Sequence, residues 1–185
     1  AVLMTAAILL GVLLALFGQT YQTGADPWQL FFNWAILLLP WALIGQSPLL
    51  WVFWLFLLNL STLLYFHAFR GGLHVLLSAS STFYWSFLVL NTLALVIWEW
   101  LSDRFHWLNR RWPPRLIGCW CMTALTWLTI LAILDFPGFW SFDIVLPVLW
   151  PLAMALTYAV YRHVKPDLFM LALGCFSGMV VTVVF

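Results

Sequence analysis

Charged residues are the scarcest class in this chain. Lys, Arg, Asp and Glu make up 7% of its 185 residues, whereas 65% are hydrophobic. Soluble domains are about 25% charged and about 45–50% apolar, so this composition excludes a soluble globular fold. A net charge of +1 also excludes a nucleic-acid partner, which requires a strongly basic surface. In a lipid bilayer an apolar protein surface does not have to be covered by polar residues. The composition therefore predicts an integral membrane protein.

Residues that bind metals or perform catalysis are few and scattered. Cys119 and Cys121 would point about 200° apart on a helix, and Cys175 lies in a later apolar run. The four histidines have no metal-ligand spacing: His67, His74, His106 and His163. The sequence also contains no Ser/His/Asp set, no paired catalytic carboxylates and no phosphate-binding glycine loop. We therefore predict no metal and no cofactor, and we assign no catalytic residue.

Seven long apolar runs are what the sequence does contain. A helix rises about 1.5 Å per residue, so about 20 residues cross a hydrocarbon core about 30 Å thick. The candidate spans are 1–17, 27–44, 49–67, 82–101, 117–134, 144–162 and 168–185. They predict an all-α polytopic transmembrane bundle, with 72–77 read either as an interfacial segment or as part of the fourth span. Because both chain ends lie inside apolar runs, we expect 1–185 to be one helical domain of a longer membrane protein.

The basic residues are concentrated in two of the six gaps between these runs. Six of the seven Lys/Arg residues lie in 102–116 and 162–167, and Arg70 is the exception. Cytoplasmic loops carry such an excess of Lys and Arg, so these two gaps are predicted to be cytoplasmic. The gaps 18–26 and 135–143 are then external, in a bacterial cytoplasmic membrane. We expect Arg70 to form an external ion pair with Asp26, Asp135 or Asp143.

The first external gap carries an unusual run of polar residues. Asp26, Pro27 and Gln29 form a capping-box pattern, in which the Asp26 side chain caps a helix that begins at Pro27. Capping does not require the polar residues before it. We consider two readings: a structural turn, or a docking site or external mouth. The candidate residues for the second reading are Gln19, Tyr21, Gln22, Thr23, Asp26 and Trp28.

Residues 17–31 read FGQTYQTGADPWQLF, and Leu39-Pro40-Trp41 follows at the end of the next apolar run. This segment resembles the signature of a family of uncharacterised bacterial multi-pass membrane proteins, known as a domain of unknown function. The segment 161–174 is also similar to that family. The resemblance implies a multi-pass helical fold and further helices outside this chain, and it implies no activity.

Polar side chains inside the spans are few. Asn33, Asn59 and Asn91 lie about 9, 12 and 14 Å from the external ends of their spans, and so form one layer. Such amides either hold helices together in lipid or line a polar pocket. Glu99 is the one acid within a predicted span and lies near its cytoplasmic end, where it marks a functional site or else reaches to Arg104 or another arginine.

Three functions follow from these residues. The first is a membrane scaffold or interaction protein, whose external motif docks a protein partner or a second copy of the chain. The second is a small transporter or channel that uses the Asn33, Asn59 and Asn91 layer. The third and weaker one is a lipid-modifying membrane enzyme with Glu99, or with Asp135 and Asp143, as its acids.

Overall fold

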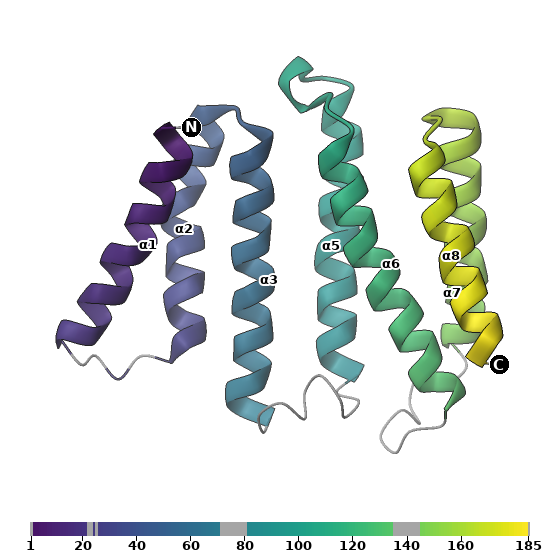
Figure 1. Cartoon of the computed structure of the whole chain (residues 1–185), viewed down its shortest axis with the longest axis horizontal. Coiled ribbons are helices and arrows are strands. Elements are labelled where there is room, and N and C mark those ends of the chain that lie inside the picture. The colour runs from purple at the N-terminus through teal and green to yellow at the C-terminus, as the bar shows by residue number, and fades with distance from the viewer. Residues whose placement is uncertain (1, 22–23, 25, 71–80, 135–144, 185) are drawn as a thin grey trace. The chain divides into compact units, whose positions relative to one another are not determined.

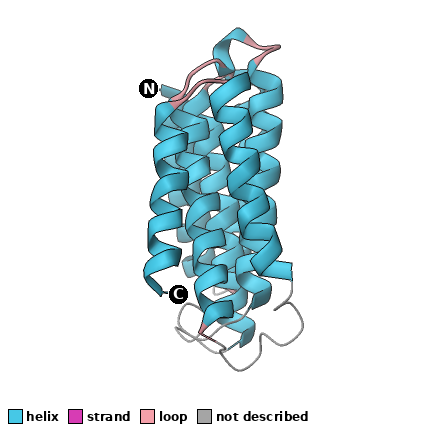
Figure 2. Ribbon diagram, turned by 90° about the vertical axis from the view of Figure 1, so that its right-hand side faces the viewer, coloured by secondary structure: helices cyan, strands magenta, loops and turns pink. Residues whose placement is uncertain are grey.

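The computed structural model describes residues 2–21, 24, 26–70, 81–134 and 145–184, and these are almost entirely helical (Figure 1). They form seven α-helices, and the described ranges contain no β-strand (Figure 2). The helices are α1 (Val2–Tyr21), α2 (Pro27–Gly45), α3 (Pro48–Arg70), α5 (Ser81–Ser102), α6 (Trp112–Ile133), α7 (Val145–Ala159) and α8 (Leu168–Val184). A 3₁₀ turn, η1 (His106–Leu108), follows α5, and a π-helical turn, η2 (Val160–Val164), extends α7. The predicted all-α fold is confirmed.

Five of the described helices are long and apolar enough to cross a membrane. They cover Val2–Thr20, Pro27–Gly45, Pro48–Phe69, Thr82–Ser102 and Trp112–Ile133. The apolar helix α8 is shorter, and α7 gains length through η2. Each predicted span overlaps one described α-helix, and a helix satisfies the hydrogen bonds of its backbone internally, as hydrocarbon requires.

The start of α6 differs from the predicted span, which began at 117. The helix begins at Trp112, and Pro113 and Pro114 occupy its first turn. Prolines are tolerated there because the first amides of a helix have no partner within the helix. Arg115 therefore belongs to the helix and not to the basic gap. The segment 72–77 lies outside the described residues, and so does the gap 135–143.

The chain divides into two compact units, 1–75 with 97–113 and 76–96 with 114–185. In the first unit, α1, α2 and α3 meet around small residues. The buried core consists of Ala7, Ala35, Leu38, Ala42, Leu50 and Leu57. The Trp34 indole donates a hydrogen bond to the Ala7 carbonyl at 2.9 Å, and the Trp54 indole donates to the Ala35 carbonyl at 3.0 Å. Close approach at small residues and hydrogen bonds between helices are what hold membrane helices together.

In the second unit, a chain of hydrogen bonds joins α7, α8 and α6. The Trp150 indole donates to the Ser177 hydroxyl at 3.2 Å, and that hydroxyl lies 2.7 Å from the Thr126 hydroxyl. The Thr126 hydroxyl donates its proton to the Met122 carbonyl of its own helix. The Ser177 hydroxyl therefore donates to Thr126 and accepts from the Trp150 indole. The side chains of Trp150, Ser177 and Thr126 thus each have a hydrogen-bond partner within the unit.

Candidate functional site

The motif at 17–31 lies partly in a helix. α1 continues to Tyr21, beyond the predicted end at 17, so Gln19 and Thr20 are exposed residues of its last turn. Gly24 has a φ of +63°, a left-handed conformation that glycine adopts without strain. Gln22 and Thr23 lie outside the described residues, as does the side chain of Tyr21.

Asp26 occupies the N-cap position of α2, and Pro27 is the first residue of the helix, as predicted. The predicted side-chain cap is wrong. Asp26 has an extended backbone (φ −64°, ψ 147°), and its carboxylate accepts no capping hydrogen bond from α2. The Asp26 carbonyl instead accepts a hydrogen bond from the Gln29 amide at 3.0 Å. Pro27 has no amide hydrogen, and the backbone closes the first turn by itself. The exposed Asp26 carboxylate is therefore not used to cap the helix.

Trp28 is the centre of an aromatic group that we call the Trp28 cluster: Trp28 and Phe32 of α2, with Tyr65 and Phe69 of α3. Tyr65 meets Trp28 edge-on at 5.2 Å between ring centroids, and Phe69 lies 4.8 Å from Tyr65. Phe32 and Phe69 lie 6.4 and 6.5 Å from Trp28. The Ser61 hydroxyl donates to the Trp28 carbonyl at 3.0 Å and so joins α2 to α3 beside the cluster.

The rings around Trp28 are largely exposed. Phe32 and Tyr65 each retain 42% of their accessible surface, and Phe69 retains 61%. The Trp28 indole nitrogen is enclosed and has no hydrogen-bond acceptor among the described residues. Sequence analysis identified Trp28 alone. The spacing of four residues between Trp28 and Phe32, and between Tyr65 and Phe69, is the signal that could have identified the others.

Asn33 and Asn59, which both belong to the first unit, lie in different surroundings. Asn59 is buried and donates to the carbonyl of Leu55, four residues earlier, at 2.9 Å. Asn33 is exposed and forms no hydrogen bond within the described part of the chain. In the second unit, Asn91 is fully buried and donates to the carbonyl of Phe87 at 2.8 Å.

Glu99 lies in the last turn of α5, half-buried between buried Trp98 and exposed Trp100. Arg104, the predicted partner of Glu99, places its guanidinium over the Trp100 ring at 4.7 Å from the centroid. Such a cation–π contact holds the arginine at the end of the helix. The Ser102 hydroxyl donates to the Glu99 carbonyl at 2.8 Å and so helps to end α5 there.

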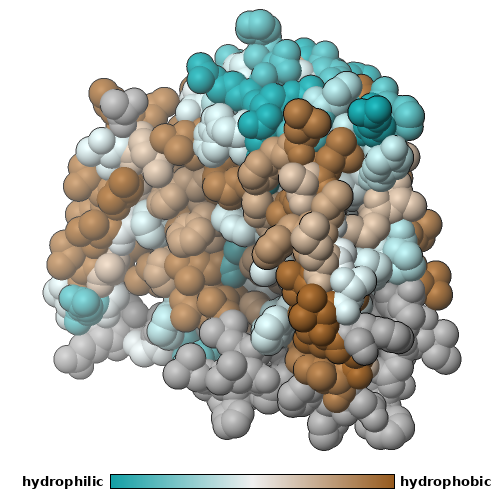
Figure 3. Space-filling view, turned by 45° about the vertical axis from the view of Figure 1, so that its right-hand side comes forward, coloured by the Kyte–Doolittle hydropathy of each residue, from teal (hydrophilic) through white to brown (hydrophobic). Residues whose placement is uncertain are grey.

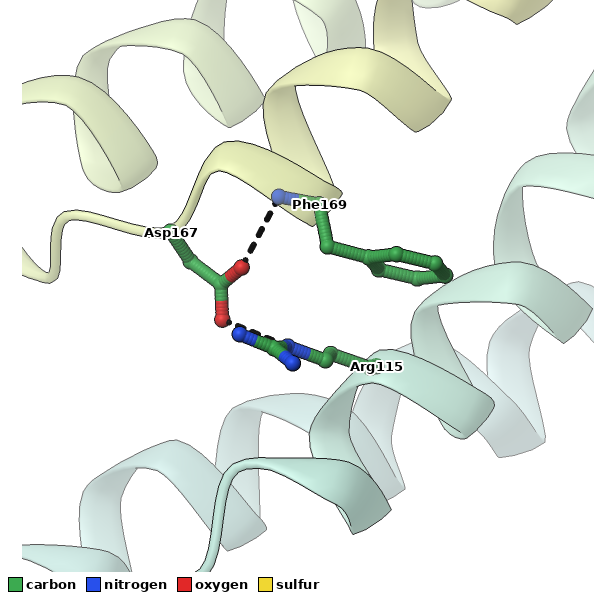
Figure 4. A network of polar contacts seen from close by, with 3 residues as sticks. All are labelled: Arg115, Asp167 and Phe169. Carbon is green, nitrogen blue, oxygen red and sulfur yellow. Dashed lines mark hydrogen bonds and ion pairs between the residues drawn. The ribbon is translucent and has the colours of Figure 1, made fainter.

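An ion pair that sequence analysis missed joins the starts of α6 and α8 (Figure 4). The Arg115 Nε donates to Asp167 Oδ2 at 3.0 Å, and the Phe169 amide donates to Asp167 Oδ1 at 3.0 Å. The Arg115 guanidinium also lies 5.7 Å from the Phe169 ring. Asp167 therefore pairs with α6 and caps α8 at once. The Pro166-Asp167 sequence before an apolar run was the available signal.

The surroundings of Asp167 favour its charged form. Its side chain is 3% exposed, and that of Arg115 is 43% exposed. Burial raises the pKa of the Asp167 carboxyl, but hydrogen bonds from Arg115 and from the Phe169 and Met170 amides, with the charge of Arg115, outweigh it and hold that pKa below its usual range. Because the two residues are in contact, the starts of α6 and α8 lie side by side.

Polar and apolar surfaces are separated along the helices. On the face drawn in Figure 3, hydrophilic residues gather at one end, and hydrophobic residues cover the helix flanks below them. Exposed apolar side chains of the helices include Leu13, Leu43, Val96, Leu156 and Met179. Within the described ranges, no three His, Cys, Asp or Glu side chains are grouped so that they could hold a metal ion.

Comparison with known proteins bears on the first two helices and the start of the third. No curated protein and no solved structure matches the chain. A family model matches residues 1–51, which cover α1, α2 and the beginning of α3 and contain the motif at 17–31. The predicted resemblance is thus confirmed over this range: residues 1–51 match the family described as "Predicted membrane protein (DUF2157)", a family of membrane proteins of unknown function.

Proposed function

We propose that this membrane protein acts as a scaffold or interaction protein, and that a protein partner docks on the Trp28 cluster. The observation that supports this proposal is the exposure of three rings, Phe32, Tyr65 and Phe69, around Trp28. Rigid aromatic side chains are the residues that most often anchor protein interfaces, because they bury much area at little entropic cost.

Polar residues beside the cluster suit a docking surface. Gln19 and Thr20 end α1, and Asp26 keeps an exposed carboxylate that the fold does not use as a cap. The exposed Asp26 carboxylate can accept a hydrogen bond from a partner. An aromatic centre with a polar rim is the usual anatomy of such an interface.

In the proposed orientation this surface is external. The gaps 18–26 and 135–143 face the outside, and 102–116 and 162–167 face the cytoplasm of a bacterial cell. The ion pair between Arg115 and Asp167 supports the grouping of the two basic gaps on one side. The ion pair proposed for Arg70 stays a prediction, since the side chain of Arg70 and residues Asp135 and Asp143 lie outside the described part.

Transport and lipid chemistry have less support. A pocket lined by Asn33 and Asn59 requires both amides to point into one cavity, whereas Asn33 is exposed and Asn59 is buried against its own helix. For the enzyme reading, Asp135 and Asp143 lie outside the described part of the chain.

Photocrosslinking tests the docking proposal. Phe69 is replaced by p-benzoylphenylalanine in the full-length protein, which is irradiated in native membranes, purified and analysed by mass spectrometry. Phe176 of α8 is the matched control, because it is also a phenylalanine and is 64% exposed against 61% for Phe69. We expect a discrete protein adduct at position 69 and only lipid adducts at 176. Lipid adducts alone at both positions would show that the cluster is a membrane anchor and would contradict the proposal.

A further inference from the structure

The outward side of α2 carries a stripe of exposed residues around Asn33. Successive residues of a helix are turned by about 100°, so residues 33, 36, 37, 40 and 44 lie within about 60° of one direction. All five are exposed: Asn33, Ile36, Leu37, Pro40 and Ile44. We call them the Asn33 stripe. It belongs to a helix that is long and apolar enough to span a membrane.

Asn33 differs from the other two intramembrane asparagines. Asn59 and Asn91 are buried, and each donates to the carbonyl four residues earlier. Asn33 makes no such bond to Gln29, although both lie on the same side of α2, and it has no other partner in the described residues. It lies six residues inside the span, about 9 Å from Pro27. A polar group left unpaired at this depth is unfavourable, because hydrocarbon offers no hydrogen bonds.

Pro40 adds a second unpaired group to the same stripe. Proline has no amide hydrogen, so the carbonyl of Ile36, four residues earlier, loses its helical donor. Ile36 is exposed and lies beside Asn33 on the stripe. The outward side of α2 therefore offers an amide, and a carbonyl that lacks its usual helical donor, among apolar side chains. Lipid alone satisfies neither of them.

We infer that the Asn33 stripe packs against the Asn33 stripe of a second copy of the chain. An amide is both donor and acceptor, so two copies related by a two-fold axis can exchange reciprocal hydrogen bonds. An unrelated helix would need its own polar residue at the same depth, whereas a second copy necessarily has one. Asparagine pairs of this kind stabilise helix association in membranes. The stripe is separate from the Trp28 cluster, so this dimer does not depend on the docking proposal.

Disulfide crosslinking in native membranes tests the geometry. Cys119, Cys121 and Cys175 are first replaced by alanine. Single substitutions Leu37→Cys and Ile44→Cys, on the stripe, should give a crosslinked dimer on mild oxidation. Phe32→Cys and Leu43→Cys are matched controls, because both positions are exposed on the same helix but are turned about 80–100° away from Asn33. They should crosslink at least tenfold less.

A second pair of variants tests the amide. Asn33→Leu should lower the association constant about tenfold, measured by energy transfer between labelled copies in vesicles, while Asn33→Gln should keep it within about threefold. Because Asn33 faces outward, both variants should keep the wild-type helix content, measured by circular dichroism. Equal crosslinking on and off the stripe, an unchanged dimer in Asn33→Leu, or a monomeric wild type would each overturn the inference.

Discussion

At the scale of single residues, two glycines of α1 are in opposite surroundings. A side chain on Gly11 would collide with the ring of Trp34, which is held in place by its hydrogen bond to the Ala7 carbonyl. A side chain on Gly18 would meet open space. Gly11 thus allows α1 and α2 to approach closely, and Gly18 has no such role.

This contrast predicts opposite effects of one substitution. Gly11→Ala should lower the free energy of unfolding by about 1–3 kcal/mol, because the core is overpacked. Gly18→Ala should raise it by up to about 1 kcal/mol through helix propensity. Thermal unfolding in detergent, followed by tryptophan fluorescence, measures both. Equal stability of the two variants would mean that α1 does not pack on α2 through Gly11.

Asp167 predicts a pH dependence of stability. Its pKa is lowered in the folded state, so its stabilising effect is complete above the unfolded value of about 3.9 and is lost as pH falls through the lower folded value. Asp167→Asn keeps an acceptor for the Phe169 amide but removes the charge pair with Arg115. We expect it to be less stable than the wild type by about 1 kcal/mol at pH 7, since Arg115 is partly exposed.

Denaturant unfolding at a series of pH values provides the measurement. The difference between the wild type and Asp167→Asn should be constant from pH 7 to about pH 5 and should shrink below about pH 4. Asp26→Asn is the control, because Asp26 is exposed and its side chain forms no capping hydrogen bond. A difference that persisted unchanged at the lowest pH would show that the charge of Asp167 is not what stabilises the α6–α8 contact.

At the scale of helices, Ser177 is the link between α6, α7 and α8. Ser177→Ala would leave the Trp150 indole N–H without its acceptor, while Thr126 would keep its bond to the Met122 carbonyl. We expect a loss of about 1–2 kcal/mol of unfolding free energy. Thr182→Ala is the control, because Thr182 is exposed and donates only to carbonyls of its own helix. If the two variants were equally stable, the hydrogen bonds of Ser177 would contribute little to helix packing.

The helices themselves could be predicted from the sequence, because a long apolar run in lipid has no alternative to internal hydrogen bonding. Their ends were less predictable. A proline in the interior of a helix interrupts it, whereas a proline in the first turn is compatible with its start. Pro113 and Pro114 lie in the first turn of α6, and the apolar pattern does not distinguish these two cases. Asp26 has the residue type of a cap, yet its side chain does not act as one.

Contacts between helices were the least predictable feature. Trp34 donates to the Ala7 carbonyl, and alanine carries no signal that it accepts a hydrogen bond. Residues far apart in sequence meet in the Trp28 cluster and in the pair of Arg115 and Asp167. Local spacing can identify the residues that each helix contributes, but not which helices come together. Counting residues predicts that Asn33 and Asn59 lie at a similar depth in the membrane. The direction in which each side chain points depends on the packing of neighbouring helices, which the sequence does not reveal.

At the scale of the whole molecule, the charge pattern predicts sidedness. Arg110 and Arg162 lie in the two basic gaps and are exposed, whereas Leu108, in the middle of the first gap, is buried. Asp26 is exposed in the gap that should lie outside. The contact between Arg115 and Asp167 requires the starts of α6 and α8 to share one side, so Arg110 and Arg162 should behave alike.

Labelling of single cysteines tests this orientation in cells. In the chain without its native cysteines, Asp26→Cys should react with a membrane-impermeant maleimide in intact spheroplasts, because position 26 is exposed. The substitution should leave α2 folded, because the Asp26 side chain does not cap this helix. Arg110→Cys and Arg162→Cys should react only after permeabilisation, since Lys and Arg are retained on the cytoplasmic side. Reaction of all three from outside would contradict the seven-span arrangement. A complete reversal would keep the spans but place the Trp28 cluster in the cytoplasm, where its partner would then have to be sought.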